Sequence, residues 1–216
     1  MLALALLPMH GVAGAAAALA QPAASDIARA PLGPAERAAI ARIERYFASV
    51  RTMRARFVQT ASTGQTAEGT VALKRPGRLR IDYDPPVPVL IVADGTWLIY
   101  NDHDLNQVSY LPLGATPAGI LVEDTIRLTG DELTITAFAH EAGVIRVTVV
   151  RTASPQDGSL TLVFSDDPLR LRQWRVVDPQ GTATTVTLVD VTTGVDLDPD
   201  LFEFVDPRHV PPDFPE

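Results

Sequence analysis

The chain has 216 residues, with 18 Lys and Arg against 26 Asp and Glu, and a net charge of −8 at pH 7. This acidic balance, without a compensating basic cluster, disfavours nucleic acid and anionic membrane surfaces as partners. The absence of cysteine excludes thiol nucleophiles, cysteine-based zinc sites and disulfides. The length is enough for one domain with a sizeable core.

The first twenty residues have the composition of an export signal. Residues 1–20 carry no Asp, Glu, Lys or Arg and end in Ala18-Leu19-Ala20, a small-x-small cleavage pattern. The usual basic start of a signal is missing, so the true translation start stays open, and a buried helix or tail is the alternative. We expect a signal peptide cleaved near Ala20, a periplasmic location and a flexible leader over 21–33.

An amphipathic helix is predicted next. Pro34 suits the first helical position. Ile40, Ile43, Phe47 and Val50 then recur at helical spacing, which predicts a helix of about four turns laid on an apolar surface.

Most of the remaining chain alternates apolar and polar residues with a period of two, which predicts strands. The predicted strands are 55–62, 66–75, 79–84, 89–94, 97–101, 107–111, 132–139, 143–151, 159–165, 169–178 and 182–191. So long an antiparallel sheet must curl, because twist accumulates. The fold class expected is mainly β: an incomplete, strongly curled antiparallel barrel of about eleven strands, with a lid of short α-helices over an apolar cavity. One domain is predicted over 34–206, followed by a loose tail over 207–216.

One segment interrupts the strands. Thr116-Pro117 supplies an N-cap and a first-turn proline, and Ile120 and Leu121 follow, so 114–130 is interpreted as a short apolar helix inserted between strands.

The stretch 68–86 contains an unusual arginine. Arg75 continues the parity of an apolar face, and a three-residue loop over 76–78 would keep it on that face across the hairpin. The residues alone leave two interpretations: the guanidinium extends to solvent at a strand end, or it makes a functional contact. The intervening charged residues, Arg80 among them, are expected to form a solvated outer face. The inward positions are Val71, Leu73, Leu79, Ile81 and Tyr83.

Catalytic and metal-binding patterns are weak. No G-x-S-x-G elbow, HExxH or P-loop occurs. The triplet 102–104 (Asp-His-Asp) is better explained as a solvated turn than as a metal site. Asp82 and Asp84 are better explained as residues on the solvent-exposed face of a strand than as an acid/base pair. Trp97 and Trp174 are interpreted as core or cavity lining rather than ligand-stacking platforms. We expect no enzyme activity and no cofactor.

The segments F-V-Q (57–59), G-x-V-x-L-K-R-P-G-R-L-R-I (69–81) and L-I-V-x-D-G (90–95) resemble the outer-membrane lipoprotein carrier (LolA-like) family. W-L-I-Y-N (97–101), Asn106-Gln107 and Thr116-Pro117 extend this resemblance, which is strongest from residue 53 to 121. It implies a half-barrel with a helical lid that carries triacylated lipoproteins from an inner-membrane lipoprotein-releasing transporter towards the outer membrane, where an acceptor would receive them.

The resemblance also implies site residues. Arg75 matches the arginine that ties the sheet to the lid, Leu79 and Ile81 match inward aromatic positions, and 114–128 matches the lid. The expected acyl-chain site and lid latch comprise Arg75, Phe57, Val71, Leu73, Leu79, Ile81, Tyr83, Trp97, Ile120 and Leu121. We expect a monomer. The alternatives are a periplasmic carrier or sensor of another lipid, or, less favoured, a hydrolase of hydrophobic substrates.

Overall fold

The structure is a computed structural model that describes residues 27–209. The predicted signal peptide, its cleavage site near Ala20 and residues 210–216 of the predicted tail lie outside this range. The helices are α1 (Pro34–Ser49) and the short 3-10 helices η2 (Leu113–Ala115), η3 (Pro117–Val122), η4 (Pro155–Asp157), η5 (Pro199–Phe202) and η6 (Pro207–His209). The strands are β1 (Thr52–Ala61), β2 (Thr66–Lys74), β3 (Arg78–Tyr83), β4 (Val89–Asp94), β5 (Trp97–Asp102), β6 (Gln107–Pro112), β7 (Leu133–Glu141), β8 (Val144–Arg151), β9 (Ser159–Ser165), β10 (Arg170–Val177) and β11 (Ala183–Thr193).

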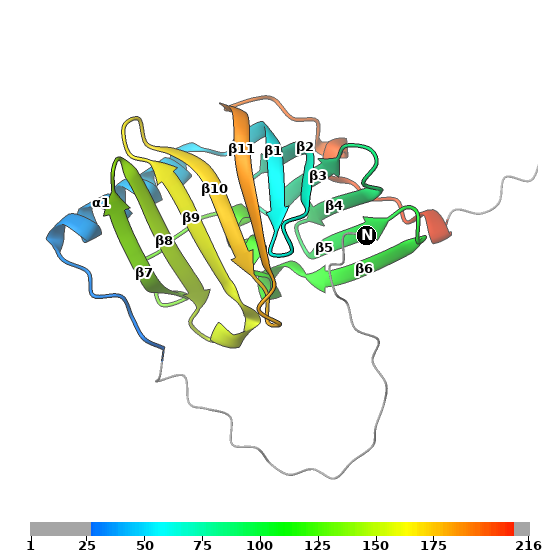
Figure 1. Cartoon of the computed structure of the whole chain (residues 1–216). Coiled ribbons are helices and arrows are strands. Elements are labelled where there is room, and N and C mark those ends of the chain that lie inside the picture. The colour runs from blue at the N-terminus through cyan, green and yellow to red at the C-terminus, as the bar shows by residue number, and fades with distance from the viewer. Residues whose placement is uncertain (1–26, 210–216) are drawn as a thin grey trace, which may run out of the picture.

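The eleven strands form one antiparallel sheet in the order β6-β5-β4-β3-β2-β1-β11-β10-β9-β8-β7. Two meanders, β1–β6 and β7–β11, are joined by the pairing of β1 with β11. The open edges β6 and β7 follow one another in sequence, so the link over 113–132 must run from one edge of the sheet to the other. Figure 1 shows the sheet strongly curled, with α1 and much of the link passing behind β7–β11 in this view. The predicted fold class, an incomplete antiparallel barrel, is confirmed.

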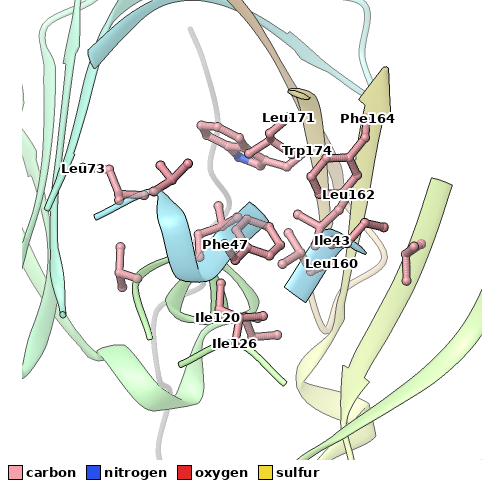
Figure 2. Packing of buried hydrophobic residues seen from close by; sticks show 14 of the residues in the cluster. Ile43, Phe47, Leu73, Ile120, Ile126, Leu160, Leu162, Phe164, Leu171 and Trp174 are labelled. Atoms are coloured by element: carbon pink, nitrogen blue, oxygen red, sulfur yellow. The ribbon is translucent and has the colours of Figure 1, made fainter. Parts of the chain in front are cut away.

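Helix α1 fills the concave side of the sheet. It begins at Pro34, as predicted, and buries Ile40, Ile43 and Phe47. Figure 2 shows Ile43 and Phe47 among the side chains of the β9 and β10 strands, and the Phe47 ring meets the ring of Phe164 edge-on at 5.6 Å between centroids. Each such fully buried side chain contributes about 1.5–3 kcal/mol through the hydrophobic effect. The packing of this apolar face therefore holds the helix against the sheet.

The expectation of an α-helix over 114–130 is wrong. The link forms two 3-10 turns, η2 and η3, with i to i+3 bonds such as that from the Gly119 amide to the Thr116 carbonyl. Thr116 is the predicted N-cap, and its Oγ1 accepts a bond from the same amide. A Cβ on Gly119 would lie 2.2 Å from the Leu113 carbonyl oxygen. This close approach of backbone to backbone favours the tighter helix.

The β2–β3 hairpin differs from its predicted register by two residues. Lys74 pairs with Arg78 and Leu73 with Leu79, so the loop is 75–77 rather than 76–78. Gly77 ends this loop at φ 75°, a conformation that glycine adopts at little cost. A shift of two residues preserves the faces, and Arg75 still lies on the concave side.

The outer face of β2–β6 is also partly covered. Residues 195–209, here called the C-terminal strap, bury Leu197 and Phe202 against Ala72. The strap is tied down by Lys74 Nζ, which donates to the Leu197 carbonyl, and by Arg80 Nη1, which donates to the Leu201 carbonyl. The expected fully solvated outer face is therefore wrong for this part of the sheet.

A candidate acyl-chain site under a clasped lid

The predicted apolar wall forms one surface. Register places Val71 opposite Ile81 and Leu73 opposite Leu79, all on the concave face. Val71, Leu73 and Leu79 are buried, and Ile81 is half-buried against the same core. The alternation of β2 and β3 thus brings these predicted site residues together.

Phe57 and Tyr83 extend this wall across β1, β2 and β3. Their rings meet edge-on at 5.3 Å between centroids, and both residues pair with Gly69. A Cβ on Gly69 would lie 2.1 Å from the Asp82 carbonyl oxygen and 2.7 Å from the Phe57 ring, so the aromatic ring covers the glycine. The Tyr83 hydroxyl donates to Gln59 Oε1 at 2.6 Å, and burial raises the pKa of this phenol. Tyr83 is therefore a neutral part of the wall.

Trp97 does not belong to this site. Leu98 packs against the concave core, and alternation places Trp97 on the opposite face, where it is 40% exposed. Its ring meets Tyr110 edge-on, and Tyr110 in turn meets Phe204 of the C-terminal strap. The prediction that Trp97 lines the cavity is wrong, because alternation along β5 turns its side chain to the outer face of the sheet.

The concave interior is filled by the protein's own side chains. An interior void of about 10 Å³ remains, enough for about one water molecule. Figure 2 shows Ile120 of the link pointing into the interior from below, opposite Trp174 of β10. The residues lining the void are Tyr46, Phe47, Val50, Met53, Leu73, Arg75, Leu79, Leu121, Leu171 and Trp174. The predicted cavity is thus closed in this conformation, with α1 and the link in place of a ligand.

Several lining residues were not among the predicted site residues. Phe47 and Val50 were predicted as the apolar face of α1, and that face is the signal that could have placed them in the site. Trp174 was interpreted from the sequence as core or cavity lining, and it does line the void. Leu171 belongs to the same strand, β10, whose alternation indicated burial but not which end of the sheet lies beneath the lid.

Arg75 is a buried cation that joins the hairpin to both lid elements. Its Nε donates to the Leu121 carbonyl at 3.0 Å and its Nη1 donates to the Phe47 carbonyl at 2.6 Å. The guanidinium carbon also lies 4.9 Å from the centre of the Phe47 ring. Burial lowers the pKa of Arg75 to about 10, which leaves the side chain charged at neutral pH. Of the two interpretations that the sequence left open, the geometry favours a contact with the lid.

Three further contacts hold the link beside Arg75. The Gly77 amide donates to the Val122 carbonyl at 2.7 Å, and Arg151 Nη2 donates to Glu123 Oε1 at 2.9 Å. Arg51 donates to the carboxylate and the carbonyl of Asp124. Residues 121–124 with these partners are here called the lid clasp. The contacts come from the β2–β3 hairpin, β8 and the α1–β1 junction, so the clasp ties the link to both meanders.

Helix α1 is fastened separately. Arg42 donates to the carboxylate and the carbonyl of Asp166, and His140 Nε2 lies 2.8 Å from the same carboxylate. These contacts hold the pKa of Asp166 below its usual range, with the Arg42 hydrogen bond as the largest cause. Glu44 Oε1 accepts bonds from the amide and hydroxyl of Thr129, which connects α1 to the link.

Within 27–209, no group of three or more His, Cys, Asp or Glu side chains is placed to hold a metal ion. His103 lies near Asn101 in the turn after β5. Over the same residues, no helix has the length and hydropathy needed to cross a membrane.

Comparison with known proteins gives a family and several relatives. The family model described as "Outer membrane lipoprotein carrier protein LolA" matches residues 48–205. The outer-membrane lipoprotein carrier protein of Methylococcus capsulatus is 30% identical over 178 residues, covering 78% of this chain and 84% of the relative. The protein of the same name from Chromobacterium violaceum is 28% identical over 199 residues, covering 87% and 93%. A LolA superfamily protein from Nitrosomonas europaea, known from its crystal structure, aligns with a TM-score of 0.43 at 11% identity over 76% of this chain and 97% of its own. The chain therefore belongs to the outer membrane lipoprotein carrier protein (LolA) family.

Proposed function

We propose that this protein is a periplasmic carrier that shields the acyl chains of lipoproteins and shuttles them from the inner to the outer membrane. The observation that carries this proposal is the buried Arg75, which joins a hairpin of the sheet to both lid elements over an apolar interior. The names of the relatives support the class of cargo. The donor would be an inner-membrane lipoprotein-releasing transporter, and an outer-membrane acceptor would receive the cargo.

The energetics explain why the lid must move. Burying a methylene contributes about 0.8 kcal/mol, so one long acyl chain contributes roughly 10 kcal/mol. Pockets that hold small molecules measure about 300–1,000 Å³, far more than the interior void of about 10 Å³. Acyl chains therefore enter only by displacing Phe47, Leu121 and their neighbours, which breaks the bonds from Arg75. Closing the lid restores these bonds and favours release.

Replacing Arg75 with Leu tests this mechanism. A Leu side chain tolerates the apolar surroundings, but the two carbonyls lose their donor, at a cost of about 1–3 kcal/mol each in the closed state. The closed state is destabilised relative to the loaded one, so Arg75→Leu is expected to bind an acylated cargo but release it to acceptor membranes at least tenfold more slowly. Arg78→Leu, at a residue of the same hairpin outside the lid clasp, is the matched control. Equal release rates for wild type and Arg75→Leu would remove Arg75 from the mechanism.

The cargo class is tested by mass spectrometry of the protein purified from periplasm. Acylated lipoprotein in the complex supports the proposal. Free lipid without lipoprotein would instead identify a carrier or sensor of another lipid.

A further inference from the structure

Three arginines share the convex face of β8, β9 and β10. Arg146 on β8 and Arg172 and Arg175 on β10 are all exposed. Across residues 27–209, none of the three has a hydrogen-bond acceptor or an ion-pair partner. Figure 1 shows these strands in front of α1, so this face lies on the side of the sheet away from the helix. The three residues are here called the arginine face.

The strand register places Arg146 and Arg175 on the same side of the sheet. Arg146 pairs with Val163 of β9, and Arg175 pairs with Thr161 of the same strand. Leu162, between these two partners, is fully buried, so Val163 and Thr161 and the residues paired with them face outward. Two strand spacings and two residues of rise put the Cα atoms of Arg146 and Arg175 about 12 Å apart.

Arg172 joins the face through a bulge. It is the extra residue on β10 between Leu171 and Gln173, where the register with β9 shifts. Leu171 is buried and lines the interior void, whereas Arg172 is exposed. The bulge therefore brings a third guanidinium to the face, about 10 Å along the strand from Arg175.

The neighbours of these arginines on the face are uncharged. By register they are Thr148, Thr161, Val163, Gln173, Thr185 and Thr187. The outer face of β1–β3 differs, because Arg56 there is paired with Asp84 and Arg80 with Asp82. The arginine face is therefore a local positive patch on a protein whose net charge is −8.

The turn between β9 and β10 bounds this patch. It carries Asp166 and Asp167, beside the exposed Arg170 at the start of β10. Asp166 is bound by Arg42 of α1. Arg170 thus lies next to carboxylates and is not counted in the arginine face.

The spacing of the three charges requires a partner with several anionic groups. The arginines are separated by roughly 10–12 Å, more than the Debye length of about 8 Å at physiological ionic strength, so their mutual repulsion is largely screened. A single exposed ion pair adds little to affinity. A partner must therefore meet two or three of these guanidinium groups at once.

The surroundings of the arginines favour a polypeptide over a membrane. Lipid-binding clusters hold about 4–8 Lys or Arg, and peripheral binding also uses large apolar side chains that insert into the bilayer. The arginine face has fewer cations, and its neighbours are mainly threonines. The sheet is also strongly curled, so its convex side meets a flat bilayer over a narrow strip, whereas a peptide segment can follow the curvature (Figure 1).

We propose that the arginine face docks an acidic segment of a partner protein. In an extended segment, every third side chain is separated by about 10 Å, which matches the spacing of the arginines. The lid lies on the other side of the sheet, so docking leaves the acyl-chain site free to open and close. This inference goes beyond the proposed function and does not depend on the cargo.

Two fluorescently labelled peptides test the inference on the mature protein, one with the sequence Glu-Gly-Ser repeated four times and the other with Lys in place of Glu. Fluorescence anisotropy at 50 mM salt measures their affinities. Wild type is expected to bind the glutamate peptide and not the lysine peptide, with an affinity that falls as salt is added. Arg146→Glu combined with Arg175→Glu is expected to weaken binding at least tenfold.

The matched control is Arg45→Glu combined with Arg54→Glu, which changes the net charge by the same amount at exposed positions outside the face. It is expected to keep the affinity within threefold of wild type. Equal weakening in the two double variants would reduce the effect to net charge and overturn the inference. A wild-type protein that does not bind the glutamate peptide would overturn it as well.

Vesicles of phosphatidylcholine with 30% phosphatidylglycerol give the third arm, by co-sedimentation. Wild type is expected to stay in the supernatant. Binding to these vesicles that is lost in the Arg146→Glu and Arg175→Glu variant would assign the face to a membrane and overturn the inference. None of these measurements uses an acylated cargo, so their failure leaves the proposed function standing.

Discussion

Arg75 places a positive charge where its two hydrogen-bond acceptors are backbone carbonyls, one from α1 and one from the link. Carbonyls do not titrate, and the pKa of Arg75, at about 10, lies well above neutral pH. Between pH 6 and 8 the contact is therefore controlled by the position of the lid and not by protonation. The arginine favours one arrangement of the lid, and only movement of α1 or the link releases it.

The Phe47 ring occupies the interior that an acyl chain would fill in the proposed mechanism. Removing this ring should therefore lower the stability of the protein but make binding of an acyl chain faster. Phe47→Ala is expected to cost about 3–5 kcal/mol of unfolding free energy and to enlarge the interior void. A hexadecyl-linked fluorescent probe should then bind faster, because less of the lid has to move. Phe202→Ala is the matched control, since Phe202 is fully buried but lies on the outer face under the C-terminal strap.

Urea titration and stopped-flow fluorescence give the two quantities. Phe47→Ala and Phe202→Ala are expected to lose similar amounts of stability. Only Phe47→Ala is expected to bind the probe faster. Equal binding rates in the two variants would show that Phe47 does not obstruct the acyl-chain site.

Among the elements, the link between β6 and β7 closes the interior together with α1. Its path from one edge of the sheet to the other follows from the strand order, because two edge strands adjacent in sequence can be joined only across or around the sheet. Its 3-10 turns place Ile120 and Leu121 inward and leave residues 121–124 within reach of three arginines. The polar contacts of the link therefore concentrate at this stretch, with a further pair from Thr129 to Glu44, which suits the lid movement proposed above.

Glu123 gives this element a weak pH dependence. Burial raises the pKa of Glu123, and Arg151 opposes the shift. A carboxyl whose pKa is raised in the folded state adds stability that is fully present below its unfolded pKa, about 4.3, and is lost as the pH rises through the raised value. Glu123→Gln keeps an acceptor for Arg151 and is expected to be as stable as wild type at pH 7 to within about 1 kcal/mol. The stability of wild type relative to this variant should rise as the pH falls from 7 towards 4. Urea unfolding at several pH values measures the difference, and a difference that is constant or that falls with the pH would contradict this assignment.

The sequence predicted the strands better than the elements that cover them. Alternation located all eleven strands, and parity placed Arg75 on the concave side even though the hairpin register was wrong by two residues. Alternation carries no information on the link, where close approaches such as that of Gly119 to Leu113 determine a 3-10 geometry. The apolar run 97–100 does not alternate, so it does not tell the inner face of β5 from its outer face, and the C-terminal strap that contacts Tyr110 on the neighbouring strand β6 is distant in sequence. For the same reason, pattern alone could not place Trp97.

At the scale of the whole molecule, the lid connects the two meanders. The clasp attaches the link to the β2–β3 hairpin through Arg75 and to β8 through Arg151, and Arg42 attaches α1 to the turn after β9. An acyl chain that enters the interior must release contacts on both sides of the β1–β11 pairing. Burying one chain contributes roughly 10 kcal/mol. This free energy must offset the loss of the hydrogen bonds and the apolar packing that hold the lid closed.

If acyl chains displace the lid, the distance between the lid and the sheet must increase when a chain binds. Because the chain has no cysteine, spin labels can be placed uniquely at Thr125→Cys on the link and Arg175→Cys on β10, both of which are exposed. Pulsed electron paramagnetic resonance then gives the distance distribution with and without the palmitoylated peptide. We expect a single distance distribution in the empty protein and a shift to longer and more broadly distributed distances when the peptide binds. An unchanged distribution at saturating peptide would mean that acyl chains bind without moving the link.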